Sequence, residues 1–387
     1  MANFIDYLNW RGDITFDQSA FNVVDAMILC ELSYYNFEGL VPSDFEEKPV
    51  LLKDVCVESV LDPLPNYCTE EDLTLCSLIK DCPRFADIRS TGYVNIVNED
   101  ANIQFSAMTF YLQKGLSFIA FRGTDDSLIG WKENMDLAYN DVVPAQKEAV
   151  SYLKEASKHC RGRILVGGHS KGGNLAVYGA AFSGKRVNKR IETIYNFDGP
   201  GFNDHVIRDE RFQEIAERTH TFVPQDSIVG LLLKHKEQYS VIHSVASNGL
   251  SQHRLFTWEV TKNNIIREEK LTKAGENYRE NISEWIDSMS YEEKQQLIKV
   301  VYGLVDDYKT TGELFSAKNL WAIVKEYRTM SDENKKIVTG AVGDLKDTVL
   351  GNIREKMDRL AREVQSSKPA EIIRKGKGIF DSYHQEG

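Results

Sequence analysis

The sequence predicts an α/β protein in which helices cover a mostly parallel, doubly wound sheet. Four apolar runs are typical of buried strands, at residues 116–121, 163–166, 191–197 and 219–223. Helix-compatible segments separate these runs, as at residues 144–158. Strands that alternate with helices favour parallel pairing, because the intervening helix returns the chain to the same end of the sheet.

Other elements follow from local patterns. Strands at 103–112 and 116–121 flank a short glycine turn, which predicts a hairpin. Thr69 followed by three acids predicts a helix that ends near Asp81. Further patterns predict a helix between Ser19 and Asn36, from an apolar stripe, and two strand-like runs at 239–245 and 255–260.

Changes of pattern along the chain predict three parts. Residues 1–85 form a helical segment packed on the core, residues 86–265 form the α/β core, and residues 266–387 form a helical extension. The extension is charge-rich and amphipathic, which predicts a helical cap or an element through which the chain forms a homo-oligomer. A membrane-surface or partner-binding helix is the alternative.

Composition excludes several classes of function. The net charge of −11 argues against a protein that binds nucleic acid through phosphates. No apolar stretch reaches the roughly 20 residues that a membrane span needs, and no leader pattern opens the chain. The six cysteines are scattered without the spacing of a metal site, so we expect a cytoplasmic protein with reduced thiols and no metal.

The residues around Ser170 combine a strand, a tight turn and a helix. Gly168-x-Ser170-x-Gly172 follows the strand at 163–166 and is the pattern of a nucleophile elbow. Glycines on both sides permit a sharp turn that exposes the serine hydroxyl. The helix that begins at Lys171 directs its N-terminus at the reacting centre. The alternative is a glycine-rich turn in which Ser170 caps the helix.

A nucleophilic serine needs a base and an orienting acid, which here follow it in the chain. Asp198 and Asp226 each come just after a strand, and the sequence favours Asp226 because aspartate is common in Gly/Pro-rich turns such as that of Asp198. The candidate bases are His235, His243 and His253. His253 is preferred because it lies in a loop that can reach the serine.

Two backbone N–H groups are expected to form an oxyanion hole. One belongs to Lys171, the residue after the nucleophile. The other belongs to Thr124, which follows a strand end and the close-approach residue Gly123. The alternative is that Thr124 caps the turn that contains Asp125 and Asp126.

These motifs resemble a known family. Phe-Arg-Gly-Thr at 121–124 and Gly-His-Ser-Lys-Gly-Gly at 168–173 resemble the oxyanion loop and elbow of the class 3 lipase branch of the α/β-hydrolases. The chain is more closely similar to a bacterial, lipase-like family known as domain of unknown function 2974, which shares the turn at 196–201, the segment 223–230 and the stretch ending at His253. The resemblance spans about residues 20–262.

The resemblance implies an α/β-hydrolase fold and a lipase- or esterase-like hydrolase of acyl esters or lipids that needs no cofactor. In class 3 lipases the acid directly precedes an Ile-Val pair, whereas Ser227 stands between Asp226 and that pair here. This departure leaves Asp198 open as the acid. A catalytically silent binding protein on the same fold is the alternative function, because a fold does not imply activity.

Overall fold

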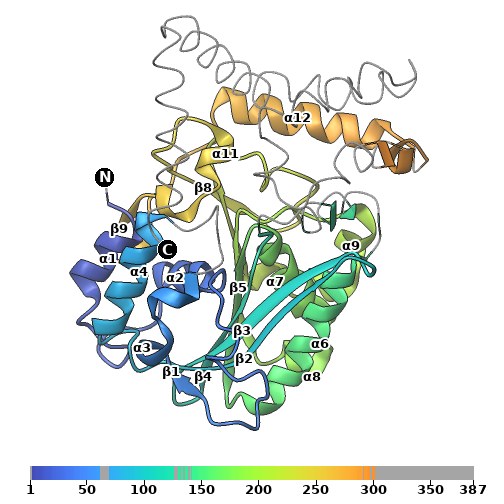
Figure 1. The fold of residues 1–387 in the computed structure, drawn as a ribbon. Helices are drawn as coiled ribbons and strands as arrows, with labels where there is room; N and C mark the ends of the chain where they lie inside the picture. The colour runs from blue at the N-terminus through green and yellow to red at the C-terminus, as the bar shows by residue number, and fades with distance from the viewer. Residues whose placement is uncertain are drawn as a thin grey trace, which may run out of the picture. The chain divides into compact units, whose positions relative to one another are not determined.

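A mixed sheet organises the computed structural model (Figure 1). Within the described residues, eight strands pair in the order of the chain, antiparallel from β1 to β4 and parallel from β4 to β8. The strands are β1 (Val50–Leu51), β2 (Arg89–Asn98), β3 (Ile103–Gln113), β4 (Leu116–Phe121), β5 (Arg163–His169), β6 (Ile191–Phe197), β7 (Thr219–Pro224) and β8 (Tyr239–Ile242). The predicted α/β class is therefore confirmed.

The structure describes residues 2–61, 69–125, 130, 132–133, 136–137, 140, 142–290, 292–296 and 299–300, all within a compact unit formed by Met1–Lys335. A two-stranded ribbon of β9 (Val260–Thr261) and β10 (Asn264–Ile265) stands apart from the main sheet. The helices are α1 (Phe4–Arg11), α2 (Val23–Leu32), α3 (Leu52–Val55), α4 (Glu70–Asp81), α6 (Pro144–His159), α7 (Lys171–Phe182), α8 (Lys185–Asn188), α9 (Asp204–Arg208), α10 (Glu210–Gln213), α11 (Gly249–Gln252) and α12 (Lys273–Ser288).

Side chains of β4 alternate between two hydrophobic cores. Phe118 and Ala120 belong to the core shared with α1, α2 and α4, whereas Ile119 and Phe121 belong to the core shared with α6 and α7. This is the two-residue period of a strand that is buried on both faces. Figure 1 shows the two helix groups on opposite sides of the sheet.

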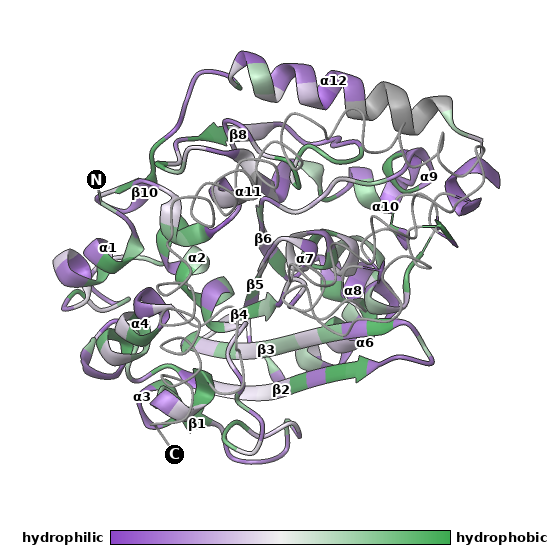
Figure 2. Ribbon diagram, turned by 45° about the horizontal axis from the view of Figure 1, so that its top comes forward, coloured by the Kyte–Doolittle hydropathy of each residue, from purple (hydrophilic) through white to green (hydrophobic). Residues whose placement is uncertain are grey.

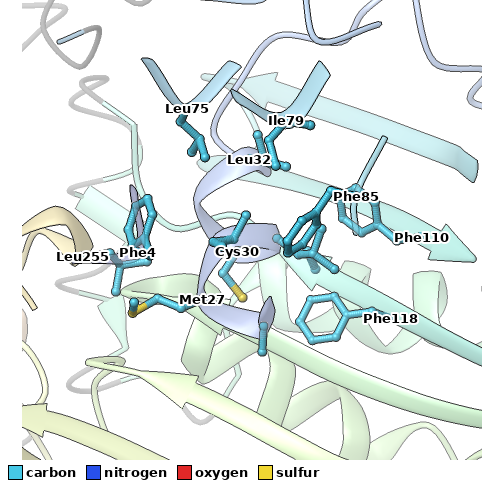
Figure 3. Close-up of a cluster of buried hydrophobic side chains, with 14 of the residues drawn as sticks. Phe4, Met27, Cys30, Leu32, Leu75, Ile79, Phe85, Phe110, Phe118 and Leu255 are labelled. Carbon is cyan, nitrogen blue, oxygen red and sulfur yellow. The ribbon is translucent and has the colours of Figure 1, made fainter. Parts of the chain in front are cut away.

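Helix α2 is buried almost all round, which the single apolar stripe at residues 19–36 did not predict. Asn22 starts the helix by accepting hydrogen bonds from the N–H groups of Val24 and Asp25. Figure 3 shows Cys30 and Leu32 of α2 among side chains from α1, α4 and the strands. The helix is therefore a central layer of the first core.

The predicted boundaries hold best where a local signal marks them. Thr69 caps α4, and the hairpin of β3 and β4 forms as expected. The strand expected at 255–260 is wrong for most of its length, because Leu255–Thr257 form a 3₁₀ turn. Strand β2 was not predicted, and its register shifts between Thr91 and Val94 around Gly92, whose φ is +65°.

The C-terminal extension is described in part. Thr272 caps the first described helix of the extension, α12, whose coloured part in Figure 2 is mostly hydrophilic with a few hydrophobic residues. The rest of the predicted extension, residues 301–387, lies outside the described residues. The three-part division and the oligomer expected from it therefore stay predictions.

A buried ion pair joins α2 to the segment after α4. The Asp25 carboxylate accepts from Arg84 at 2.6 and 2.7 Å and from the Tyr7 hydroxyl at 2.7 Å, and both charged side chains are fully buried. Asp25→Asn would leave the Arg84 charge buried without its partner. We expect the free energy of unfolding in urea to fall by ~3–5 kcal/mol.

The matched control is Asp87→Asn, which breaks the exposed ion pair of Asp87 with Lys53. Such exposed pairs contribute little to stability. Equal unfolding midpoints for the two variants would contradict the importance of the Asp25 pair.

Candidate active site

Ser170 lies in a strained turn between β5 and α7. Its φ of +58° and ψ of −134° are unusual for a residue with a side chain. A Cβ added at Gly172 would lie 2.1 Å from the Phe121 oxygen, so this position requires glycine for the helix to approach β4. Backbone strain of this kind clusters at functional sites.

Ser170 occupies the N-cap position of α7, but its side chain makes no capping hydrogen bond. Lys171 is the first residue of the helix. The first N–H groups of a helix lack intrahelical acceptors, and the helix dipole favours negative charge beside them. This end of α7 is therefore suited to stabilise an oxyanion next to Ser170.

His253 forms a close contact with Asp198. The Nδ1 atom of His253 lies 2.6 Å from Oδ2 of Asp198, whose side chain is fully buried. Because a carboxylate accepts and does not donate, Nδ1 carries the proton and Nε2 is left able to accept one. The pair has the composition and tautomer of a general base with its orienting acid.

Asp226 does not contact His253, which corrects the acid favoured from the sequence. Its carboxylate accepts from Gln252 at 3.2 Å and from the hydroxyl of Thr272. Asp198 follows β6, the direct neighbour of β5, whereas Asp226 follows β7, one strand further away. Asp198, which the sequence left open, is the residue that meets the imidazole.

Ser227 supports Asp198 from the other side and was not assigned a role from the sequence. Its hydroxyl donates to Oδ1 of Asp198 at 2.6 Å and accepts from the N–H of Gly230 at 2.9 Å. Both carboxylate oxygens of Asp198 are therefore occupied. The segment match at 223–230 contained this residue but gave no reason to single it out.

His169 holds His253 beside the elbow. Its Nε2 donates to the backbone oxygen of His253 at 2.7 Å, and its Nδ1 accepts from the Tyr34 hydroxyl at 2.9 Å. The two imidazole centroids are 4.4 Å apart. These contacts place His169 in a supporting position. Tyr34 carried no sequence signal because it comes from the distant N-terminal segment.

The loop after β4 lies against the elbow. A Cβ added at Gly123 would lie 2.8 Å from the Cβ of Ser170 and 2.6 Å from the oxygen of His169. Thr124, the next residue, is buried. The loop is therefore close enough to Ser170 to contribute to an oxyanion hole, as the sequence predicts.

The two other candidate bases have partners elsewhere. His235 contacts Glu237 at 3.0 Å and the oxygen of Gly230 at 2.8 Å. His243 contacts Glu268 at 2.7 Å. His253 is thus the candidate that the structure brings to the elbow.

Neither a metal cluster nor a membrane-spanning helix occurs in the part of the chain that the structure describes. Five cysteines fall in that part, and all five are buried free thiols: Cys30, Cys56, Cys76, Cys82 and Cys160.

The parallel strands, the helices on both faces and the sharp turn at Ser170 define an α/β-hydrolase fold. A family model described as Mbeg1-like, a lipase-like family, matches residues 79–303, which is more than half of the chain. The protein belongs to the Mbeg1-like family. The match includes Ser170, Asp198 and His253.

Solved structures of fungal lipases are distantly similar. One fungal lipase is 10% identical with a TM-score of 0.38, over 72% of this chain and 94% of that chain. A lipase of Rhizomucor miehei in a propeptide complex is 17% identical with a TM-score of 0.33, over 48% of this chain. The chain spans 63% of the length of that lipase. Structural similarity at this distance carries no argument about activity. No curated protein matches the chain.

The neutral state of His169 makes stability depend on pH. Burial lowers the pKa of His169 well below its ordinary value of 6.5, and the neighbouring His253 acts in the same direction. Below pH 6.5 the unfolded chain therefore binds a proton that the folded chain excludes, and stability falls. We expect wild type to lose up to ~1.4 kcal/mol per pH unit more than His169→Gln as the pH decreases from that value.

Urea unfolding of both proteins between pH 7.5 and pH 5 measures this difference. Glutamine offers one donor and one acceptor without a titratable proton, so it is the matched replacement. Parallel pH slopes for the two proteins would show that His169 titrates normally in the folded chain.

Proposed function

We propose that this protein is a serine hydrolase of carboxylic esters, with Ser170 as nucleophile, His253 as base and Asp198 as orienting acid. The observation that carries the proposal is the 2.6 Å contact between His253 and the buried Asp198, held beside the strained turn of Ser170. The lipase-like family and the α/β-hydrolase fold support the same class of chemistry.

The proposed reaction uses this chain's own groups. Nε2 of His253 accepts the hydroxyl proton while Oγ of Ser170 attacks the acyl carbon. The N–H groups of Lys171 and Thr124 stabilise the resulting oxyanion. His253 then donates its proton to the departing alcohol, and a water molecule releases the acid in a second cycle of the same steps.

The substrate class is an acyl ester or a lipid, and the mechanism requires no cofactor. Membership of the family known as domain of unknown function 2974, a bacterial origin and a cytoplasmic location belong to this proposal as sequence-based expectations. A silent binding protein on the same fold would keep the sheet without an activated serine, so covalent labelling separates the two functions.

Ser170→Ala tests the nucleophile. We expect a fluorophosphonate probe to label wild type and to leave the variant unlabelled, because the probe reacts with an activated serine hydroxyl. Hydrolysis of a short-chain p-nitrophenyl ester should fall by ~10³-fold or more. Circular dichroism of both proteins controls for folding. Repeated absence of label on folded wild type would favour the binding protein.

A pair of aspartate variants tests the acid. Asp198→Asn should lower kcat by ~10³- to 10⁴-fold, because the imidazole loses the carboxylate that sets its tautomer. Asp226→Asn is the matched comparison and should lower kcat less than tenfold, since Asp226 contacts Gln252 and Thr272 instead of His253. The opposite ranking would return the role of acid to Asp226.

A further inference from the structure

Lys171 carries a fully buried charge directly after the nucleophile. Its Nζ atom lies 2.7 Å from Oε2 of Glu133, and both side chains have no exposed surface. Nζ also donates to the backbone oxygen and to Oε1 of Gln104, at 2.8 and 2.7 Å. All three ammonium protons therefore have acceptors.

Glu133 is fixed by further contacts with the start of α6 and with β3. Its Oε1 atom accepts from the N–H of Ala145 at 2.8 Å, and its Oε2 atom accepts from the N–H of Gln104 at 3.3 Å. A buried pair of this kind is often no more stable than well-packed apolar side chains. The stability of the fold therefore does not by itself explain why Lys171 and Glu133 are buried next to Ser170.

The ammonium group fixes the orientation of the Gln104 amide. Because Nζ of Lys171 can only donate, it selects Oε1 of Gln104 and turns Nε2 to the other side. There Nε2 reaches the backbone oxygen of Gly123 at 3.4 Å and Oδ2 of Asp125 at 3.5 Å. Both contacts are long, but both fall on the loop that lies against Ser170.

The contact to Gly123 bears on the expected oxyanion donor. The carbonyl of Gly123 and the N–H of Thr124 belong to one planar peptide group and point in opposite directions. A group that holds the carbonyl oxygen therefore also sets the direction of the N–H. A second contact on the same loop, from Arg122 to Asp125 at 3.1 Å, limits rotation further.

We propose that Lys171 is a positioning residue for both donors of the oxyanion hole. Its backbone supplies one N–H at the start of α7, and its side chain, through Gln104, orients the peptide that supplies the N–H of Thr124. This inference rests on the proposed hydrolase function. Burial lowers the pKa of Lys171 below its ordinary value, and the Glu133 carboxylate opposes this shift in favour of the charged form.

The principal variant is the double substitution Lys171→Met/Glu133→Leu, which removes both charges and leaves neither buried alone. We expect kcat for the p-nitrophenyl ester to fall ~10- to 100-fold, less than the loss of a whole oxyanion donor, with KM within about twofold of wild type. Affinity for a trifluoromethyl ketone, which forms a tetrahedral adduct with serine, should fall by a similar factor.

Gln104→Met is the second variant, because it cuts the relay while leaving the ion pair in place. It should reproduce the split between kcat and KM. The control is Arg84→Met/Asp25→Leu, which removes the buried pair of the first core and should change the free energy of unfolding without lowering kcat. The comparison separates positioning from a general loss of stability.

Amide hydrogen exchange at residues 122–125 provides a readout that does not depend on activity. We expect exchange of this loop to quicken at least tenfold in the double variant and in Gln104→Met, and to be unchanged in the control. If both test variants keep the kcat, the ketone affinity and the loop exchange of wild type, the positioning role is overturned. A wild-type protein that neither hydrolyses esters nor takes the probe would overturn the proposed hydrolase instead, and the exchange data would still decide whether Lys171 orders the loop.

Discussion

The parallel register of β4 to β7 is the constraint on which the site depends. Phe121 pairs with Gly168, His169 pairs with Phe197, and Phe197 pairs with Phe222. The carboxyl ends of these strands therefore meet at one edge of the sheet, where open α/β sheets bind their ligands. The loop at 122–125, the turn at Ser170 and Asp198 each follow one of these ends, so their proximity comes from backbone hydrogen bonding before any side chain contributes.

Short-range signals explain what could be predicted from the sequence. The elbow at Ser170, the cap at Thr69 and the hairpin of β3 and β4 depend on residues close together in the chain. The choice of acid does not. Asp198 and Asp226 both follow strands, and the deciding factor is where α11 places His253, which is a tertiary effect. The Gly/Pro-rich turn made Asp198 look like an ordinary turn residue. Its φ of +51° does not decide between the two interpretations, because positive φ occurs both in tight turns and at functional sites.

The support of the site was harder to predict because it comes from distant parts of the chain. Tyr34 reaches His169 from 135 positions away, and Gln104 reaches Lys171 from 67 positions away. The helix α2 that precedes Tyr34 is buried on nearly every side, so its sequence pattern does not predict which elements it packs against. A lysine at the start of a helix is ordinarily expected in solvent, and nothing local indicated that this one would be buried.

These distant contacts explain how the turn at Ser170 can remain strained. A non-glycine residue keeps a positive φ when several independent contacts around it fix its position. On one side of Ser170, His169 is fixed between Tyr34 and the backbone of His253. On the other side, Lys171 has all three ammonium protons bound by Gln104 and Glu133. Ser170 is therefore held through both of its neighbours in the chain. The buried polar groups around it are costly for folding, and they keep its backbone in an otherwise unfavourable conformation.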